Sequence, residues 1–259
     1  MTQYYNGNNF NNVAFANIFD SWVMRGYGGN DTLGGHNLSD WIYGGYGNDT
    51  LYGYGGNDTI YGESGIDWIY GGTGNDYLNG GSDNDVLYGE SGNDTMVGEF
   101  GNDWMHGGTG TDYMYGGWGN DEMQGSDGFD RLYGGGNDDK LFGQNDSDYL
   151  YGESGNDQLI GGYGNDWMVG GTGTDSLWGG AGFDSFVYTG GGGTDWVKDF
   201  QNGFDRVVID VAGYNSYADV APIKSQWGAH TLLSFGGGNF VVIENTNAGT
   251  INGADFSFI

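Results

Sequence analysis

Eighteen aspartates recur at an interval of nine residues between Asp31 and Asp184. Their carboxylates are hard oxygen donors, the ligand type that Ca²⁺ prefers. Acid–base catalysis also uses paired carboxylates, but it requires a few of them at one site and no column of this length. The regular spacing therefore favours a cation site that repeats along the chain.

The aspartate interval belongs to a nine-residue repeat that runs without insertion or deletion. Residues 26–187 divide into 18 consecutive nonapeptides with the consensus G-G-x-G-N-D-x-(Leu/Ile/Met)-(Tyr), as in residues 44–52 and 161–169. Position 1 is glycine and position 6 is aspartate in every unit. Position 8 is always a large apolar residue, from Leu33 to Phe186. A repeat of this kind is the signature of a solenoid.

Each column of the repeat has a physical interpretation. Glycines at positions 1, 2 and 4 permit a tight turn whose carbonyls point inward. Positions 7 to 9 predict a short strand whose middle residue faces the interior. Two units then form one 18-residue coil, and stacked coils form two parallel sheets with an apolar seam between them.

The repeats resemble the RTX (repeats-in-toxin, haemolysin-type) calcium-binding nonapeptide over residues 26–187. The resemblance implies an all-β fold, a right-handed parallel β-roll solenoid of about nine 18-residue coils with N-terminal and C-terminal β caps. It also implies that calcium lies between successive turns of one edge. Its ligands there are backbone carbonyls and the position-6 aspartates of units n and n+2, which implies roughly 16 Ca²⁺ ions.

The implied metal ligands form one series on each edge of the roll. The first edge contains Asp31, Asp49, Asp67, Asp85, Asp103, Asp121, Asp139, Asp157 and Asp175. The second edge contains Asp40, Asp58, Asp76, Asp94, Asp112, Asp130, Asp148, Asp166 and Asp184.

Four units lack glycine at position 4, where Leu38, Asp83, Asn137 and Asp146 stand. Asn and Asp tolerate the left-handed backbone region, so we expect their turns to survive. Leu38 does not, and we expect the calcium site at its turn to be weak or empty.

The composition is acidic and rich in glycine. The 259 residues include 58 glycines, 35 acidic and six basic residues, for a net charge of −29. So few basic residues argue against nucleic acid as a partner, and no apolar run is long enough to span a membrane. Phe, Trp and Tyr make up 17% of the chain, which argues against disorder. We expect the carboxylates to repel one another without metal, so that the chain folds only when calcium binds.

The ends of the chain differ from the repeats. Residues 1–25 predict an N-terminal cap that contains Val13, Phe15, Ile18, Phe19, Trp22 and Met24. Residues 188–259 predict a C-terminal β cap with strands at 196–197, 207–209, 231–235, 240–243 and 256–259. This segment resembles the cap of serralysin-type exoproteins, which implies a C-terminal signal read by a type I exporter. The polar residues 1–12 lack the features of a secretory signal peptide.

Motifs of two enzyme classes are absent from the sequence. There is no H-E-x-x-H metalloprotease motif and no G-x-S-x-G nucleophile elbow, and the three histidines His36, His106 and His230 are scattered. We therefore expect that the chain is not an enzyme.

Aromatic residues at outward strand positions form a candidate glycan or partner surface. The candidates are Trp41, Tyr77, Tyr113, Tyr149 and Trp167. An aromatic ladder can also serve only to stabilise the strands on which it lies. Ice binding is a further alternative, because Thr73 to Asp76 resembles turns of ice-binding adhesins.

These features together predict a secreted calcium-binding structural or interaction protein of the bacterial cell surface or extracellular matrix. We expect type I export machinery as a partner, and either self-association or binding to cell-surface polysaccharide. A calcium-dependent glycan-binding module is the alternative prediction.

Overall fold

The computed structural model describes residues 2–17 and 20–259. The chain divides into two compact units, residues 1–132 and 133–259, and each is considered by itself. Ile18 and Phe19, which belong to the expected N-terminal cap, lie outside the described residues.

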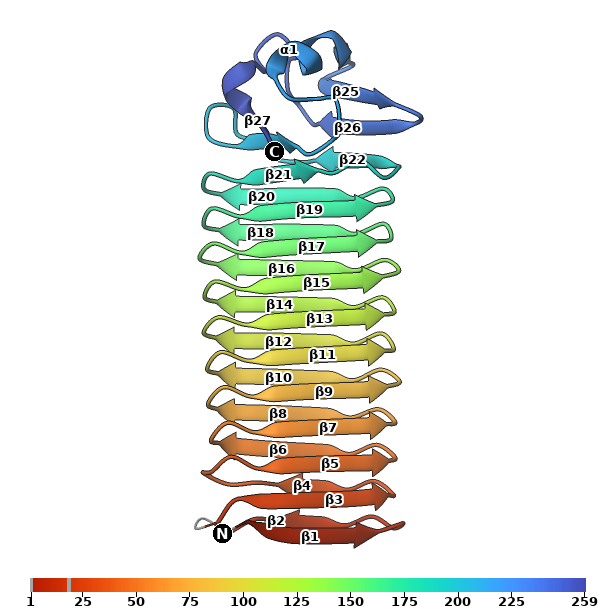
Figure 1. Cartoon of the computed structure of the whole chain (residues 1–259), viewed down its shortest axis with the longest axis vertical. Helices are drawn as coiled ribbons and strands as arrows, with labels where there is room; N and C mark the ends of the chain where they lie inside the picture. Colours follow the sequence, from red (N-terminus) through yellow and green to blue (C-terminus); the bar gives the residue numbers. More distant parts are fainter. Residues whose placement is uncertain (1, 18–19) are drawn as a thin grey trace. The chain divides into compact units, whose positions relative to one another are not determined.

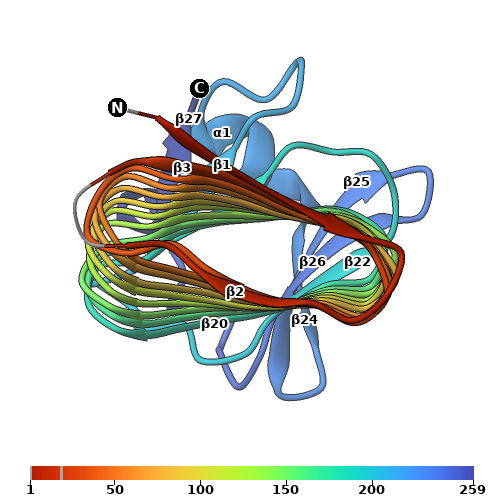
Figure 2. The ribbon, with the colours of Figure 1, turned by 90° about the horizontal axis from the view of Figure 1, so that it is seen from below.

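The N-terminal unit contains two parallel β-sheets that face each other across a narrow interior (Figures 1 and 2). Paired residues lie 18 positions apart, as in Leu87 opposite Met105, so each pair of nonapeptides makes one coil. One sheet contains β1 (Gln3–Asn8), β3 (Trp22–Gly28), β5 (Trp41–Tyr46), β7 (Thr59–Ser64), β9 (Tyr77–Ser82), β11 (Thr95–Phe100) and β13 (Tyr113–Trp118). The other contains β2 (Val13–Phe15), β4 (Thr32–Gly34), β6 (Thr50–Gly55), β8 (Trp68–Thr73), β10 (Val86–Ser91), β12 (Trp104–Thr109) and β14 (Glu122–Asp127).

Most strands of the repeats are six residues long and therefore longer than the three positions expected from the sequence. In β10, for example, Val86 to Tyr88 occupy positions 7 to 9, and Gly89 to Ser91 are positions 1 to 3 of the next unit. The glycine-rich half of each unit thus still pairs with its neighbours in the sheet. Only positions 4 to 6 remain to form the turn.

The interior of each unit is a column of position-8 side chains, as the sequence predicts. In the N-terminal unit this column is completely buried and contains Leu33, Ile42, Leu51, Ile60, Ile69, Leu78, Leu87, Met96, Met105, Met114, Met123 and Leu132. In the C-terminal unit the column contains Leu141, Leu150, Leu159, Met168, Leu177 and Phe186, each at most 2% exposed. This packing and the parallel register confirm the predicted parallel β-roll.

The first strands of the chain pair in register with the repeats. Tyr5 of β1 lies opposite Met24 of β3, which lies opposite Ile42 of β5. Ala14 of β2 likewise lies opposite Leu33 of β4. The segment before the first nonapeptide thus adds parallel strands to both sheets.

The C-terminal unit begins as the same roll and ends in a different arrangement. β15 (Arg131–Gly136) contains the boundary between the units. One sheet of the C-terminal unit contains β17 (Tyr149–Ser154), β19 (Trp167–Thr172), β21 (Ser185–Tyr188), β23 (Arg206–Ile209) and β27 (Phe256–Phe258). The other contains β16 (Lys140–Asn145), β18 (Gln158–Tyr163), β20 (Ser176–Ala181), β22 (Thr194–Val197), β26 (Asn239–Ile243), β25 (His230–Gly236) and β24 (Lys224–Trp227).

The strands predicted after the repeats are confirmed as β22, β23, β25, β26 and β27. β24, β25 and β26 pair in antiparallel fashion, and β26 pairs in parallel with β22. A short helix α1 (Tyr217–Val220) and two 3₁₀ turns, η1 (Ala221–Ile223) and η2 (Gly253–Asp255), lie between these strands in sequence.

Candidate metal sites at the turns

The position-6 aspartates of each edge form a column of buried side chains. Each is at most 3% exposed. After Asp31 and Asp40, which accept from Asn12 N and Trp22 N, the Oδ1 atom of the column aspartates accepts a hydrogen bond from the backbone N–H of the equivalent aspartate one coil earlier, as in Asp49 N to Asp67 and Asp76 N to Asp94. In the N-terminal unit the bond from Asp49 N to Asp67 Oδ1 measures 2.7 Å, and that from Asp58 N to Asp76 Oδ1 also measures 2.7 Å. The equivalent bonds in the C-terminal unit include Asp157 N to Asp175 Oδ1, at 2.9 Å. One carboxylate oxygen of each aspartate thus fixes the side chain.

The other carboxylate oxygen, Oδ2, is buried and receives no hydrogen bond at many of these positions. This holds among the described residues for Asp31, Asp49, Asp58, Asp67, Asp76, Asp85, Asp94, Asp103, Asp112, Asp157, Asp166 and Asp184. A buried charged oxygen without a partner is costly. Buried oxygens without a hydrogen bond that recur in successive turns indicate a bound ligand that the protein itself does not supply.

The glycine at position 1 keeps open the space that such a ligand requires. A Cβ on Gly62 would lie 2.3 Å from Asp67 Oδ2 and 2.5 Å from the carbonyl oxygen of Gly80, one coil later. The same two kinds of oxygen surround Gly152, at 2.4 Å from Asp157 and 2.5 Å from Gly170. Position 1 is therefore glycine because a side chain would fill this oxygen-lined gap. The positive φ angles of the turn occur at positions 2 and 4 and not at position 1.

The four units without glycine at position 4 divide as the residue types predict. Asp83, Asn137 and Asp146 adopt φ angles of 83°, 83° and 70°, so their turns keep the left-handed conformation. Leu38 has no positive φ, and the strand before its turn, β4, is only three residues long. Asp40 of the same unit accepts a hydrogen bond from His36 N at Oδ2, at 2.9 Å. The oxygen that is free of hydrogen bonds in other turns is thus already engaged in this one.

Burial dominates the electrostatics of the columns. It raises the pKa of Asp58, Asp85 and Asp94 to about 8, and the charges of neighbouring column carboxylates act in the same direction. The backbone N–H bond to each carboxylate opposes this shift. A bound divalent cation would reverse the effect, because it favours the ionised form.

The described turns do not contain a metal site that is made of side chains alone. Within residues 2–17 and 20–259, no three His, Cys, Asp or Glu side chains gather in a group that could hold a metal ion. The oxygens next to the gaps at Gly62 and Gly152 are one carboxylate oxygen and one backbone carbonyl oxygen each. All of these donors are hard oxygens, so the set fits calcium.

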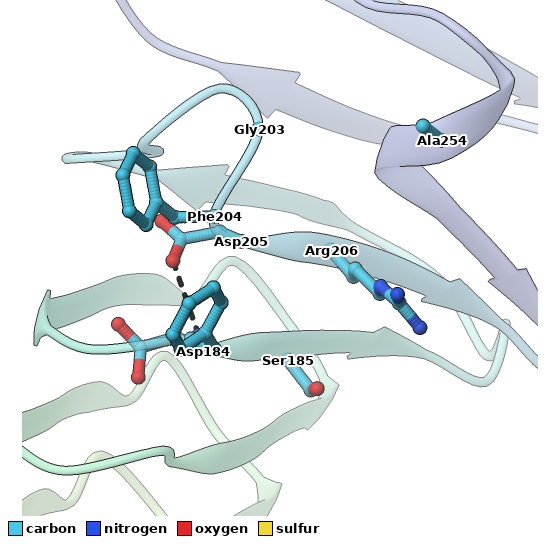
Figure 3. A pocket seen from close by; sticks show the side chains of 8 residues that line it. Asp184, Ser185, Gly203, Phe204, Asp205, Arg206 and Ala254 are labelled. Atoms are coloured by element: carbon cyan, nitrogen blue, oxygen red, sulfur yellow. Dashed lines mark hydrogen bonds between the residues drawn. The ribbon is translucent and has the colours of Figure 1, made fainter.

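Each column of aspartates continues with one more aspartate after the last nonapeptide. The sequence analysis did not identify these two residues. Asp205 accepts a hydrogen bond from Asp184 N at 3.1 Å (Figure 3). It accepts a second one from Gln201 N at 2.7 Å. The two aspartates line a cavity of about 350 Å³ together with Phe183 and Phe204. On the other edge, Asp195 follows Asp175. Aligning residues 188–205 with the repeat could have found both, after allowing two inserted residues before Asp195 and one more before Asp205.

The asparagine of the G-N-D consensus has a role that the sequence analysis also missed. The Oδ1 of Asn75 accepts a hydrogen bond from Asn93 N at 2.9 Å, and Asn93 Oδ1 accepts one from Thr111 N at 2.8 Å. Ser39 performs the same role for Asn57 through its hydroxyl oxygen. These position-5 bonds connect successive turns next to the carboxylate column, so they hold the turns in register.

The candidate aromatic surface is partly exposed. In the N-terminal unit, Trp41 is 49% and Tyr113 37% exposed, and Thr59 separates Trp41 from Tyr77 in the sheet. In the C-terminal unit, Tyr149 and Trp167 lie opposite each other in β17 and β19.

Regular stacking of aromatic rings is found at position 9 of the sheet that contains β6, β8 and β10. The ring centroids of Tyr52 and Tyr70 lie 5.0 Å apart, and those of Tyr70 and Tyr88 also lie 5.0 Å apart. His106 continues this row at 6.1 Å from Tyr88. The stacking supports a role of these rings in stabilising the sheet.

Comparison with known proteins places these turns in a family. The model of the RTX calcium-binding nonapeptide repeat matches residues 34–69, 61–96, 88–123, 115–150, 124–159 and 151–186, more than half of the chain. The chain belongs to the RTX calcium-binding nonapeptide-repeat family. It is therefore a calcium-binding β-roll protein, as the resemblance implied.

No curated protein sequence matches the chain. Among solved structures, the chain is similar to the extracellular lipase LipA from Serratia marcescens, with 19% sequence identity and a TM-score of 0.42. The match covers 72% of this chain, which spans 40% of the length of that lipase. Among the described residues, no helix has the length and apolar character needed to cross a membrane.

Proposed function

We propose that the protein is a secreted structural or interaction protein of the cell surface or extracellular matrix, which folds when calcium binds and then self-associates. The observation that carries the calcium-dependent part of this proposal is the set of buried Oδ2 atoms without a hydrogen bond that includes Asp49 and Asp67 on one edge and Asp58 and Asp76 on the other. Such columns make the roll dependent on cations along its length. Calcium ions bound by the eighteen position-6 aspartates, about 16 in number, are part of the proposal.

The proposed coupling between calcium binding and folding also supports secretion by a type I exporter. A chain that requires millimolar calcium would stay unfolded in a calcium-poor cytosol and fold after it leaves the cell. In this proposal the chain has three parts, an N-terminal cap (residues 1–25), the roll (26–187) and a C-terminal cap (188–259). The export signal lies in the C-terminal cap. The position-6 carboxylates have a structural task in this account, so we propose no catalytic role for the chain.

A calcium titration followed at once by circular dichroism and light scattering tests this proposal. We expect β-structure to form at millimolar calcium and large ordered particles to follow. Folding without any increase in particle size would overturn the self-association part. A β signal that does not respond to calcium would overturn the whole proposal.

Glycan binding is a second candidate, favoured by the half-exposed rings of Trp41 and Tyr113. Aromatic faces of this kind can stack on sugar rings. We expect calcium-dependent retention on a polysaccharide column that is lost in the Trp41→Ala and Tyr113→Ala variants and kept in Tyr113→Phe. Equal retention of all variants would exclude this surface as the binding site.

A further inference from the structure

Two side chains stand where the repeat has glycine on the sheet that contains β6, β8 and β10. Position 2 of these strands is Tyr54, Gly72 and Glu90, which lie opposite one another in neighbouring coils. Tyr54 and Glu90 adopt φ angles of 70° and 71°. This backbone conformation is unfavourable for residues with a Cβ, whereas glycine adopts it without steric cost. Strain that is retained in this way indicates a task for the two side chains.

The two side chains lie on either side of a hollow above Gly72. Its lining consists of Tyr52, Tyr54, Tyr70, Gly72 and Glu90, and its volume is about 450 Å³. Gly72 contributes no side chain, and the backbones of its two neighbours are two strand spacings apart, about 10 Å. Tyr54 is 49% exposed, and Glu90 is exposed as well. The hollow is therefore open to solvent, with a tyrosine ring on one side and a carboxylate on the other.

The Tyr54 ring turns one face toward this hollow. The Tyr52 and Tyr70 rings stack from one coil to the next, with their centroids 5.0 Å apart and their planes inclined by 9°. The Tyr54 ring is inclined by only 15° to the Tyr52 ring, so its faces also point along the direction in which the coils stack. The His36 ring, one coil earlier, has its centroid 6.5 Å from that of Tyr54. The opposite face of Tyr54 points to the coil of Gly72, where no side chain covers it.

The N-terminal unit itself shows which cation its tyrosine rings accept. Its only Lys or Arg residues are Arg25 and Arg131. The guanidinium of Arg25 lies 5.0 Å from the centre of the Tyr43 ring, and that of Arg131 lies 5.1 Å from the centre of the Tyr113 ring. In both pairs the two residues are 18 positions apart, so each guanidinium contacts a tyrosine of the neighbouring coil. Both arginines are engaged in this way, so a cation in the hollow must come from another molecule.

We propose that the hollow above Gly72 binds a guanidinium group of another molecule between the Tyr54 ring and the Glu90 carboxylate. A guanidinium is planar and stacks on aromatic rings, and its N–H groups donate to carboxylates. The net charge of −29 also attracts cations to the protein. The site requires a folded roll but none of the position-6 aspartates, so it goes beyond the proposed calcium-dependent function.

Titration of the full chain with Nα-acetylarginine amide, followed by NMR at saturating calcium, tests the site. We expect the ring signals of Tyr54 and Tyr70 to shift and to reach saturation. Nα-acetylcitrulline amide is the matched control, because it has nearly the same shape and no charge, and it should cause no such shifts. Equal shifts with both compounds, or none with the arginine compound, would overturn the proposal.

The source of the guanidinium group is distinguished by a short peptide with one central arginine. Tighter binding of the peptide than of the amide indicates an arginine side chain of a protein. Equal binding indicates a free guanidinium compound. Both results support the site, whereas a peptide that shifts neither tyrosine ring contradicts it.

Variants identify the groups that bind the cation. Glu90→Gln removes the charge and keeps the size of the side chain, and we expect it to weaken binding of the arginine compound about two- to fivefold, the effect of an exposed ion pair. Tyr54→Leu, which removes the ring, should weaken binding by a similar factor. Circular dichroism confirms that each variant is folded.

Glu63→Gln is the matched control variant. Glu63 is an exposed glutamate at position 2 of the other sheet, with a φ of 75°. Its substitution should leave the affinity for the arginine compound unchanged. An equal loss in Glu63→Gln and Glu90→Gln would show only a general attraction of cations to the acidic surface, and the proposal of a site above Gly72 would then be wrong.

Discussion

Removal of calcium at pH 8 should unfold the N-terminal unit, and the column from Asp31 to Asp103 allows the effect to be estimated. Consecutive strands lie about 4.8 Å apart. Two unit charges at that spacing repel by about 1 kcal/mol in bulk water and about 3.5 kcal/mol at an effective dielectric constant of about 20. The column contains five buried aspartates and four consecutive pairs. Their repulsion therefore amounts to roughly 4 to 14 kcal/mol on this edge alone.

This magnitude equals the whole stability of a typical domain, which is about 5 to 15 kcal/mol. The second column of the same unit adds a similar contribution. The metal-free roll at pH 8 is thus expected to have no net stability. In the proposed arrangement each calcium ion lies between two carboxylates and attracts both, so that calcium binding would reverse the sign of this contribution.

The assay is far-UV circular dichroism of the full chain before and after exhaustive chelation with EGTA. We expect the β signal to be lost on chelation and to return when calcium is restored at millimolar concentration. Magnesium is the matched control. It should not restore the signal, because it demands a small octahedral site and keeps its water ligands. A β signal that survives exhaustive chelation at pH 8 would refute this reasoning.

Three further predictions follow from the turns and the core. Burial raises the pKa of Asp58 and Asp85 to about 8 from an ordinary value of about 4, so the folded metal-free chain binds more protons than the unfolded chain between these values. Its stability should be greatest near pH 4 and fall as the pH rises to 8, and a chelated sample whose circular dichroism gains no β signal on acidification would contradict this. Gly65→Ala should raise the calcium concentration at the folding midpoint, because the φ of Gly65 is 116° and the new Cβ would lie 2.1 Å from the carbonyl oxygen of Gly47. Gly28→Ala is the control: its new Cβ would have no contact under 3.6 Å, so the midpoint should not change. Leu87→Ala should lower the free energy of unfolding in calcium by about 2 to 5 kcal/mol by urea titration, and a loss under about 1 kcal/mol would show that the column does not form the core.

The nonapeptide carries enough information to predict the fold of the roll. The roll has a local period, so position 8 identifies the core column and position 6 the carboxylate column without knowledge of any distant contact. Leu87 and Asp85 are buried for this reason, as expected. Even the irregular turn at Leu38 could be anticipated, because only the residue type at one position decides it.

Features that depend on contact between coils were not visible in the sequence. The asparagine at position 5 is plain in the consensus, yet its bond to the next coil, as from Asn93 N to Asn75 Oδ1, exists only once the register is known. The reason for glycine at position 1 also lies in the neighbouring coil. Asp195 was missed because two inserted residues break the period in the sequence while the backbone keeps it in space.

Backbone strain at position 2 shows that the regular turns are not favoured by their local sequence alone. Gly45 and Gly72 hold positive φ angles there, but Tyr54, Glu63 and Glu99 adopt φ angles of 70°, 75° and 74° in the same place. For residues with a Cβ this conformation costs about 1 to 2 kcal/mol each. Their turns are therefore unfavourable in isolation, so contacts between stacked coils must offset this cost. A coil of this kind is not expected to fold alone, and the proposed calcium binding should therefore be cooperative with the stacking of coils.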